Sequence, residues 1–460
     1  MARQPAPKQH AFQRDWVRGS VTGNLLSLSW PIMVHYALFM VGQAVDMIWI
    51  GRLGSAAVAG VGTAFIIHML VVSAKMGLDA GARAMIARAI GSGDIQRASH
   101  LGTQAFVVSM IYGIFFSALG LIFADKILDL FKLRPEVAAL GTAYMRMLFS
   151  GWIFYSLWLL AFNIMQASGD TTTPMFIHLF TRCVQLVLSP FMVFGWWVFP
   201  RLGVQGAALA MIIGQGLGMV ISLWILFRGE KSRLRLTLKG FRLDVLNIGH
   251  MVKIGLPALV MGVQANLGQT VLMKIIAPFG TLAIASHTLN QQVEMFVFMP
   301  GFGLGAGAGV LVGQNLGAQQ PNRAERTGWN ATALMEGYMA FCAIAVFLGA
   351  PNLMRIFTTE AELIRLGATF LRIASIGYLM TGFIASLQNS ISGSGDTVPP
   401  MMISILSTWI LLLPAAFLLP HVTDLGVYGI RWAMVLTQFF GALAYIIYFR
   451  LGRWKRKTVG

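Results

Sequence analysis

Residues 168–174 read SGDTTTP, and residues 394–400 read SGDTVPP, with Ser, Gly, Asp and Thr in the same order and proline at the same place. Glycine gives the backbone conformational freedom, Asp or Ser can cap a helix, and proline suits its first turn. Each stretch therefore predicts a tight turn between two helices, with Asp170 and Asp396 as turn residues. Two copies of one turn in a single chain indicate an internal repeat.

The repeat extends far beyond the turn. Residues 31–177 align with residues 257–403 at a constant offset of 226, without a gap. Two unrelated apolar segments would share Leu, Val and Ala by composition alone, but they would not share Gly, Pro, Arg and Asn in one register. The matching pairs include Pro31/Pro257, Gly42/Gly268, Gln43/Gln269, Gly77/Gly303, Gly91/Gly317, Arg97/Arg323, Arg146/Arg372 and Asn163/Asn389.

The composition is that of a polytopic membrane protein. The chain has 460 residues, of which 57% are hydrophobic and only 11% are charged, and its mean hydropathy is +0.70. Soluble domains carry about 25% charged residues. Each membrane crossing needs about 20 apolar residues as a helix, because only a helix or a closed barrel satisfies the backbone in lipid. We predict twelve all-α spans: 24–50, 56–88, 99–123, 138–166, 174–199, 204–228, 248–277, 282–312, 327–350, 364–391, 399–420 and 427–450.

Six spans in each repeat make both halves run in the same direction. We therefore expect two six-helix bundles, related by an axis along the membrane normal, with a site between or inside them. The predicted division is an N-terminal tail (1–23), a first lobe (24–228), a basic linker (229–247), a second lobe (248–450) and a C-terminal tail (451–460).

The net charge of +17 comes mainly from basic residues beside the apolar spans. This is the positive-inside pattern, and it places both tails and the linker in the cytoplasm. We expect a multi-pass protein of the cell inner (plasma) membrane that has lipid around it and binds no nucleic acid. Cys183 and Cys342 both lie in apolar spans, so no disulfide framework is predicted.

Four motifs in order resemble the multidrug and toxic compound extrusion (MATE) family. They are the doubled SGDT turn, PIMVHYALFMVGQAVDMIWIGRLGSAAVAGVG at 31–62, ARAMIARAIGSGDIQRA at 82–98, and GVLVGQNLGAQQPNRAERTG at 309–328. The resemblance covers roughly residues 20–450. It implies a V-shaped pair of lobes, alternating access, and export of drug-like compounds in exchange for H⁺ or Na⁺.

Asp46 is the first candidate for ion coupling. A charged side chain at the centre of a span costs about 2.5–3.5 kcal/mol on insertion scales, so its presence calls for a reason. Its repeat partner is Leu272, so only the first lobe carries the acid. The resemblance places an ion-coupling Asp at this position. The alternative is a structural acid paired with a buried Lys or Arg.

Glu294 and His68 occupy equivalent positions in the two repeats and are also candidates for ion coupling. The two could face one central cavity and bind a proton or another cation. The alternative is that His68 is an interior histidine and Glu294 bonds a neighbouring helix. Lys75, Asp79 and Arg83 are spaced four residues apart on one helix, which favours local pairing.

The candidates for substrate contact are the polar side chains among the apolar spans. They are Tyr36, Gln43, Asn163, Gln264, Asn266 and Gln269. No catalytic constellation or metal motif is present, so we predict neither an enzyme nor a cofactor other than the coupling ion. Sodium-coupled members of the resembled family often carry a carboxylate where this chain has Ala265, which favours H⁺.

The sequence thus predicts a secondary active exporter, monomeric, that exchanges amphipathic organic cations for H⁺. A Na⁺-coupled exporter stays open. So does a flippase for lipid-linked precursors, although twelve spans and the lack of an Arg cluster in the span interiors argue against it. A channel or an enzyme has less support.

Overall fold

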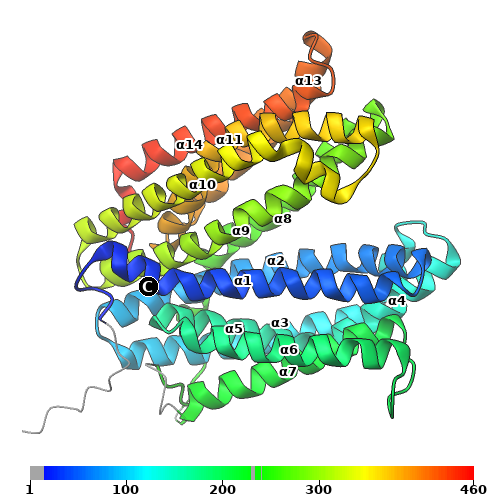
Figure 1. Cartoon of the computed structure of the whole chain (residues 1–460). Coiled ribbons are helices and arrows are strands. Elements are labelled where there is room, and N and C mark those ends of the chain that lie inside the picture. The colour runs from blue at the N-terminus through cyan, green and yellow to red at the C-terminus, as the bar shows by residue number, and fades with distance from the viewer. Residues whose placement is uncertain (1–14, 229–233, 240, 460) are drawn as a thin grey trace, which may run out of the picture.

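A computed structural model describes residues 15–228, 234–239 and 241–459, and the chain is helical almost throughout (Figure 1). The rest of the predicted tails and linker lies outside the described residues. The first repeat forms α1 (Val21–Gly51), α2 (Ser55–Gly91), α3 (Ile95–Asp129), α4 (Pro135–Ser150), α5 (Trp152–Ser168), α6 (Thr172–Phe194) and α7 (Val204–Arg228). The second forms α8 (Val245–Ile276), α9 (Thr281–Gly317), α10 (Pro321–Phe357), α11 (Ala361–Gly393), α12 (Val398–Ile405), α13 (Leu413–Val422) and α14 (Tyr428–Leu451).

The twelve predicted spans are all present in the described part of the chain. Eleven helices or continuous helical runs are long and apolar enough to cross a membrane, and α4 with α5 forms a twelfth that bends by 53°. The bend falls at Gly151, where a side chain would collide with Ile212 of α7. A π-helical segment, Leu406–Leu412, joins α12 to α13 just before Pro414, which lacks the N–H that a regular turn needs.

Helix ends differ from the predicted spans by several residues. The fifth span was predicted to reach residue 199, but α6 ends at Phe194, and residues 195–203 form a loop. In the second repeat, α9 and α10 extend beyond the apolar segments that were predicted as spans, and residues 318–320 connect the two helices. Hydropathy detects only the apolar part of such a helix, so it misses polar turns that extend beyond the hydrocarbon layer.

The two lobes make a V (Figure 1). They approach each other at the end where the described chain begins and ends, and they separate towards the other end. We call these the closed end and the open end. Among the described residues, the hydrogen bonds between the lobes extend from the closed end to the Asn266–Ser73 bond of 3.3 Å, which joins α8 to the middle of α2 and is the nearest to the open end.

Glycines let the lobes approach in the closed half, and they do so twice. Gly77 of α2 packs against the backbone of Leu259 in α8, and its repeat partner Gly303 in α9 packs against Met33 in α1. Met33 and Leu259 are themselves repeat partners. The α2–α8 and α9–α1 contacts are therefore two copies of one interface, which small residues make possible by removing the side chain at the crossing.

The doubled SGDT turns lie at the closed end, as helix-joining turns. Gly169 and Gly395 both have positive φ, +93° and +90°, which glycine adopts without strain. Asp170 accepts a 3.0 Å hydrogen bond from the amide of Thr173 in the first turn of α6. Asp396 does more than form a turn, because it accepts a 2.5 Å bond from Tyr448 and lies 3.4 Å from Lys457.

Candidate functional site

Asp46 lies inside the first lobe and is joined to a row of polar side chains on α6. Its Oδ2 accepts a 2.5 Å hydrogen bond from Gln185 Nε2, and Gln185 Oε1 accepts a 2.7 Å bond from Arg182 Nη1. Thus Gln185 separates the carboxylate from the guanidinium. The other oxygen, Oδ1, is buried and makes no hydrogen bond of normal length, although the Ser189 hydroxyl interacts with the same carboxylate.

The row continues to a pair of buried histidines. Arg182 Nη2 lies 3.3 Å from His178 Nε2, and His178 Nδ1 lies 2.6 Å from Nδ1 of His35 on α1. Such a contact requires one ring to donate and the other to accept. His35 also stacks on Phe162 at 4.0 Å between ring centroids. We call Asp46, Gln185, Arg182, His178 and His35 the N-lobe polar chain.

A small cavity of about 10 Å³ adjoins this chain and is lined by Arg182, His178, Tyr155, Thr181 and Gln215, among others. That volume is about the space of one water molecule. The side-chain nitrogen of Gln43, one of the predicted substrate contacts, is also buried nearby on α1 without a hydrogen-bond partner. Polar groups with unfilled hydrogen-bonding capacity thus remain around Asp46.

A second charged group occupies the middle of α2. Lys75 and Asp79 are both almost completely buried and form an ion pair, as the local-pairing prediction required. The side-chain nitrogen of Asn163 lies 3.4 Å from the other Asp79 oxygen. Asn163 was predicted to contact substrate, but in the structure it is buried inside the lobe, where its amide contacts the Asp79 carboxylate.

Glu294 in the second lobe is paired directly with an arginine. Arg431 Nη1 of α14 donates to Glu294 Oε1 at 2.9 Å, and only 1% of the Arg431 side chain is exposed. The guanidinium also lies 5.0 Å from the ring centre of Phe370. The structure therefore shows the helix-to-helix bond that was the alternative for Glu294, and the ion-coupling role stays a prediction.

His68 is enclosed in the core of the first lobe. It has no solvent exposure, neither ring nitrogen has a hydrogen-bond partner among the described residues, and Trp152 meets it edge-on at 5.1 Å. Glu294 and His68 each lie inside their own lobe. They therefore do not face one central cavity, contrary to the prediction, and the interior-histidine alternative describes the surroundings of His68.

The remaining substrate candidates divide by exposure. Gln264 is buried and bonds Ser404 (2.7 Å) and Trp409 (3.2 Å) inside the second lobe. Asn266 and Gln269 on α8 are exposed, and Gln269 accepts a 3.0 Å bond from Gln291. Tyr36 reaches across the lobes to Phe302, with 6.1 Å between ring centroids.

Two arginines inside the spans, Arg182 and Arg431, were not predicted as site residues. Both lie within helices that cross the membrane, Arg182 beside Asp46 and Arg431 beside Glu294. A signal for Arg182 was available, because residues 178, 182 and 185 share one face of a helix. The partners on α1 were not available from that pattern.

The two lobes are also hydrogen-bonded at the closed end through the repeated turns. Arg88 of α2 donates to the Ser394 carbonyl of the second-lobe turn at 2.8 Å. Gln314 of α9 donates to the carbonyl of Ala167, beside the first-lobe turn, also at 2.8 Å. Arg88 and Gln314 are repeat partners. We call these two bonds the closed-end latch.

The model of the family described as MatE matches residues 31–191 and again residues 257–418. Among curated proteins, a probable multidrug resistance protein NorM of Thermotoga maritima is 26% identical over 443 residues, covering 95% of this chain and 93% of the relative. An FAD transporter of Shewanella oneidensis is 24% identical over 91% of this chain and 92% of its own length.

Solved structures match over almost the whole chain. An outward-facing multidrug resistance MATE family transporter of the MOP superfamily superposes with a TM-score of 0.89 at 21% identity, covering 95% of this chain and 96% of that one. A MOP superfamily transporter of Pyrococcus furiosus gives 0.90 at 21% identity, over 96% and 98% of the two chains. At this identity the likeness establishes the V-shaped fold.

Proposed function

Because this chain belongs to the MatE family, we propose that it is a secondary active multidrug exporter that exchanges amphipathic organic compounds for protons by alternating access. It acts as a monomer in the cell inner membrane, with both termini cytoplasmic. The observation that carries the proposal is the N-lobe polar chain, in which Asp46 is partly buried, accepts a hydrogen bond from Gln185 and makes no direct ion pair with any described residue.

Asp46 can change its charge more easily than Glu294. Removing one charge from a buried, directly bonded ion pair leaves its partner uncompensated, which costs about 3–5 kcal/mol. Glu294 is in that position, because Arg431 contacts it. Asp46 meets Arg182 only through Gln185, so protonation of its carboxyl group breaks no salt bridge. This difference favours Asp46 as the residue that loads and releases the coupling ion.

The surroundings of Asp46 favour H⁺ over Na⁺. Sodium, like other hard cations, is held by several oxygen ligands, whereas a proton needs one oxygen. The group that faces Asp46 Oδ2 is the amide nitrogen of Gln185, which donates a hydrogen bond.

Alternating access is supported by the way the lobes touch. Their contacts in the closed half include two equivalent glycine crossings and the closed-end latch, an arrangement that suits rocking of the lobes about a pseudo-two-fold axis. In the open half, the exposed amides of Asn266 and Gln269 offer polar contacts beside apolar side chains such as Leu267. This mixture suits amphipathic substrates.

The test is transport of a fluorescent cationic dye into or out of liposomes that contain the purified protein. A pH jump and a Na⁺ jump are applied separately to the wild type, to Asp46→Asn and to Asp424→Asn. The last is the matched control, since it makes the same chemical change at an exposed acid. We expect dye movement driven by the pH jump, lost in Asp46→Asn and kept in the control. Movement driven by Na⁺ alone contradicts proton coupling.

A further inference from the structure

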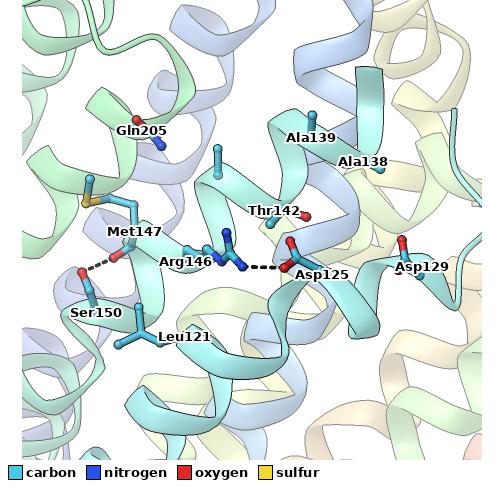
Figure 2. A pocket seen from close by; sticks show the side chains of 11 residues that line it. Leu121, Asp125, Asp129, Ala138, Ala139, Thr142, Arg146, Met147, Ser150 and Gln205 are labelled. Carbon is cyan, nitrogen blue, oxygen red and sulfur yellow. Dashed lines mark hydrogen bonds and ion pairs between the residues drawn. The ribbon is translucent and has the colours of Figure 1, made fainter. Parts of the chain in front are cut away.

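A cavity of about 640 Å³ lies at the open end of the first lobe, between the end of α3, the outer face of α4 and the start of α7 (Figure 2). Its size is within the range of sites for small organic ligands, about 300–1,000 Å³. It is separate from the N-lobe polar chain, and no residue of that chain lines it.

Three charged side chains line the cavity. Arg146 of α4 and Asp125 of α3 point towards each other and form an ion pair, and about half of each side chain is exposed (Figure 2). Asp129 lies one helical turn further along α3, and within the described chain it takes part in no ion pair. The cavity thus offers one cation and two carboxylates, one of which is unpaired.

Asp125 and Asp129 lie in the last turns of α3, just beyond the predicted span 99–123. Asp129 is the last residue of α3 and Pro135 is the first of α4, so both spans end here. The neighbouring wall is apolar and includes Leu121, Ala139 and Met147. A charged rim above an apolar wall matches a phospholipid, whose headgroup lies at the interface while its chains extend into the hydrocarbon layer.

The second lobe does not repeat this arrangement. Arg146 has its partner in Arg372, but Pro351 replaces Asp125 and Arg355 replaces Asp129. The equivalent place in the second lobe therefore has two cations and neither carboxylate. A groove that only had to contact bulk lipid would not need acids in one lobe and cations in the other.

We propose that this cavity binds a phospholipid whose headgroup carries a primary ammonium, such as phosphatidylethanolamine. The phosphate contacts Arg146, the ammonium donates hydrogen bonds to Asp129, and an acyl chain lies along the apolar wall. Phosphatidylcholine has no N–H to donate, and phosphatidylglycerol has no cation for Asp129. Charge-assisted hydrogen bonds to both ends of one headgroup give the selectivity.

The experiment is native mass spectrometry of the purified full-length protein titrated separately with phosphatidylethanolamine, phosphatidylcholine and phosphatidylglycerol. The variants are Asp129→Asn and, as a matched control, Asp424→Asn, which removes another exposed acid from the α13–α14 loop. Size-exclusion profiles establish that each variant is folded. We expect wild type to bind phosphatidylethanolamine about fivefold more tightly than phosphatidylcholine, as the loss of one hydrogen bond worth about 1 kcal/mol would give.

We expect Asp129→Asn to abolish this preference and Asp424→Asn to keep it. Equal binding of all three lipids by the wild type overturns the proposal, since it indicates ordinary lipid contact. Preference for phosphatidylglycerol overturns it as well, because Arg146 alone would then determine binding. An undiminished preference in Asp129→Asn removes the role given to that carboxylate. None of these outcomes depends on the transport activity.

Discussion

The two lobes are alike where they touch each other and differ where they bury charge. Gly77 and Gly303 make the same crossing, and Arg88 and Gln314 make the same bond to the opposite lobe. By contrast, Asp46 has Leu272 as its repeat partner. The proposed function therefore uses both copies of the interface for movement, but an acid in only one lobe for coupling.

The surroundings of Asp46 and Glu294 also differ between the lobes. Asp46 is joined to Arg182 through Gln185, while Glu294 bonds directly to Arg431. An acid held by a direct ion pair is fixed in its charged form, and an acid one side chain away is not. This difference is the reason why we propose coupling through the first lobe and a structural role for the charge pair of the second.

The largest effect is expected when the acid is moved from one lobe to the other. Asp46→Asn should reduce pH-driven dye transport to the level of protein-free liposomes, because no other acid in the first lobe has the same surroundings. The double change Asp46→Asn/Leu272→Asp should not restore it, since Leu272 is fully buried among apolar residues. Transport by the double variant would show that the lobes are interchangeable.

Breaking the second-lobe pair should affect stability more than coupling. Arg431→Met leaves Glu294 as an uncompensated buried charge and should destabilise the protein by about 3 kcal/mol. The double change Glu294→Gln/Arg431→Met should recover most of that loss. Thermal unfolding in detergent measures both. If the double variant unfolds normally but no longer couples transport to pH, Glu294 belongs to the coupling machinery and the contrast between the lobes fails.

Filling either glycine crossing should disturb the closed end to a similar extent. A methyl group at Gly77 would collide with the backbone of Leu259, and one at Gly303 with that of Met33. We expect Gly77→Ala and Gly303→Ala each to weaken the packing of the two lobes at the closed end by about 1–3 kcal/mol. Distances between spin labels at the closed end report the shift. Gly62→Ala on α2, where a methyl group meets nothing within 4 Å, is the control.

The smallest effect is expected at the closed-end latch. Arg88→Ala and Gln314→Ala each remove one hydrogen bond to a carbonyl of the opposite lobe, worth about 1 kcal/mol. Both variants should increase the fraction of molecules in which the two lobes are separated at the closed end. The same spin-label measurement should show increases of comparable size. Asn322→Ala, at an exposed position of the same end, should not. Unequal effects would mean that one lobe dominates the latch.

Hydropathy and the repeat predicted the twelve spans and the two lobes, because the length of each apolar segment and the register of the repeat can be determined from the sequence alone. The bend at Gly151 was not predicted, since it depends on the side chain of Ile212 in another helix. The neighbours of Asp46 were missed for a related reason. Hydrogen bonds such as Gln185–Asp46 depend on how two helices are rotated about their axes, which one sequence does not specify.

Proton movement during substrate transport tests the central claim most directly. Proteoliposomes with an entrapped pH-sensitive fluorophore, prepared without Na⁺, receive substrate on one side, and the internal pH is followed. The account predicts that substrate entry by the wild-type protein drives protons outward, and that Asp46→Asn shows neither flux. Substrate flux without proton flux in the wild type, or an unchanged proton flux in Asp46→Asn, would contradict it.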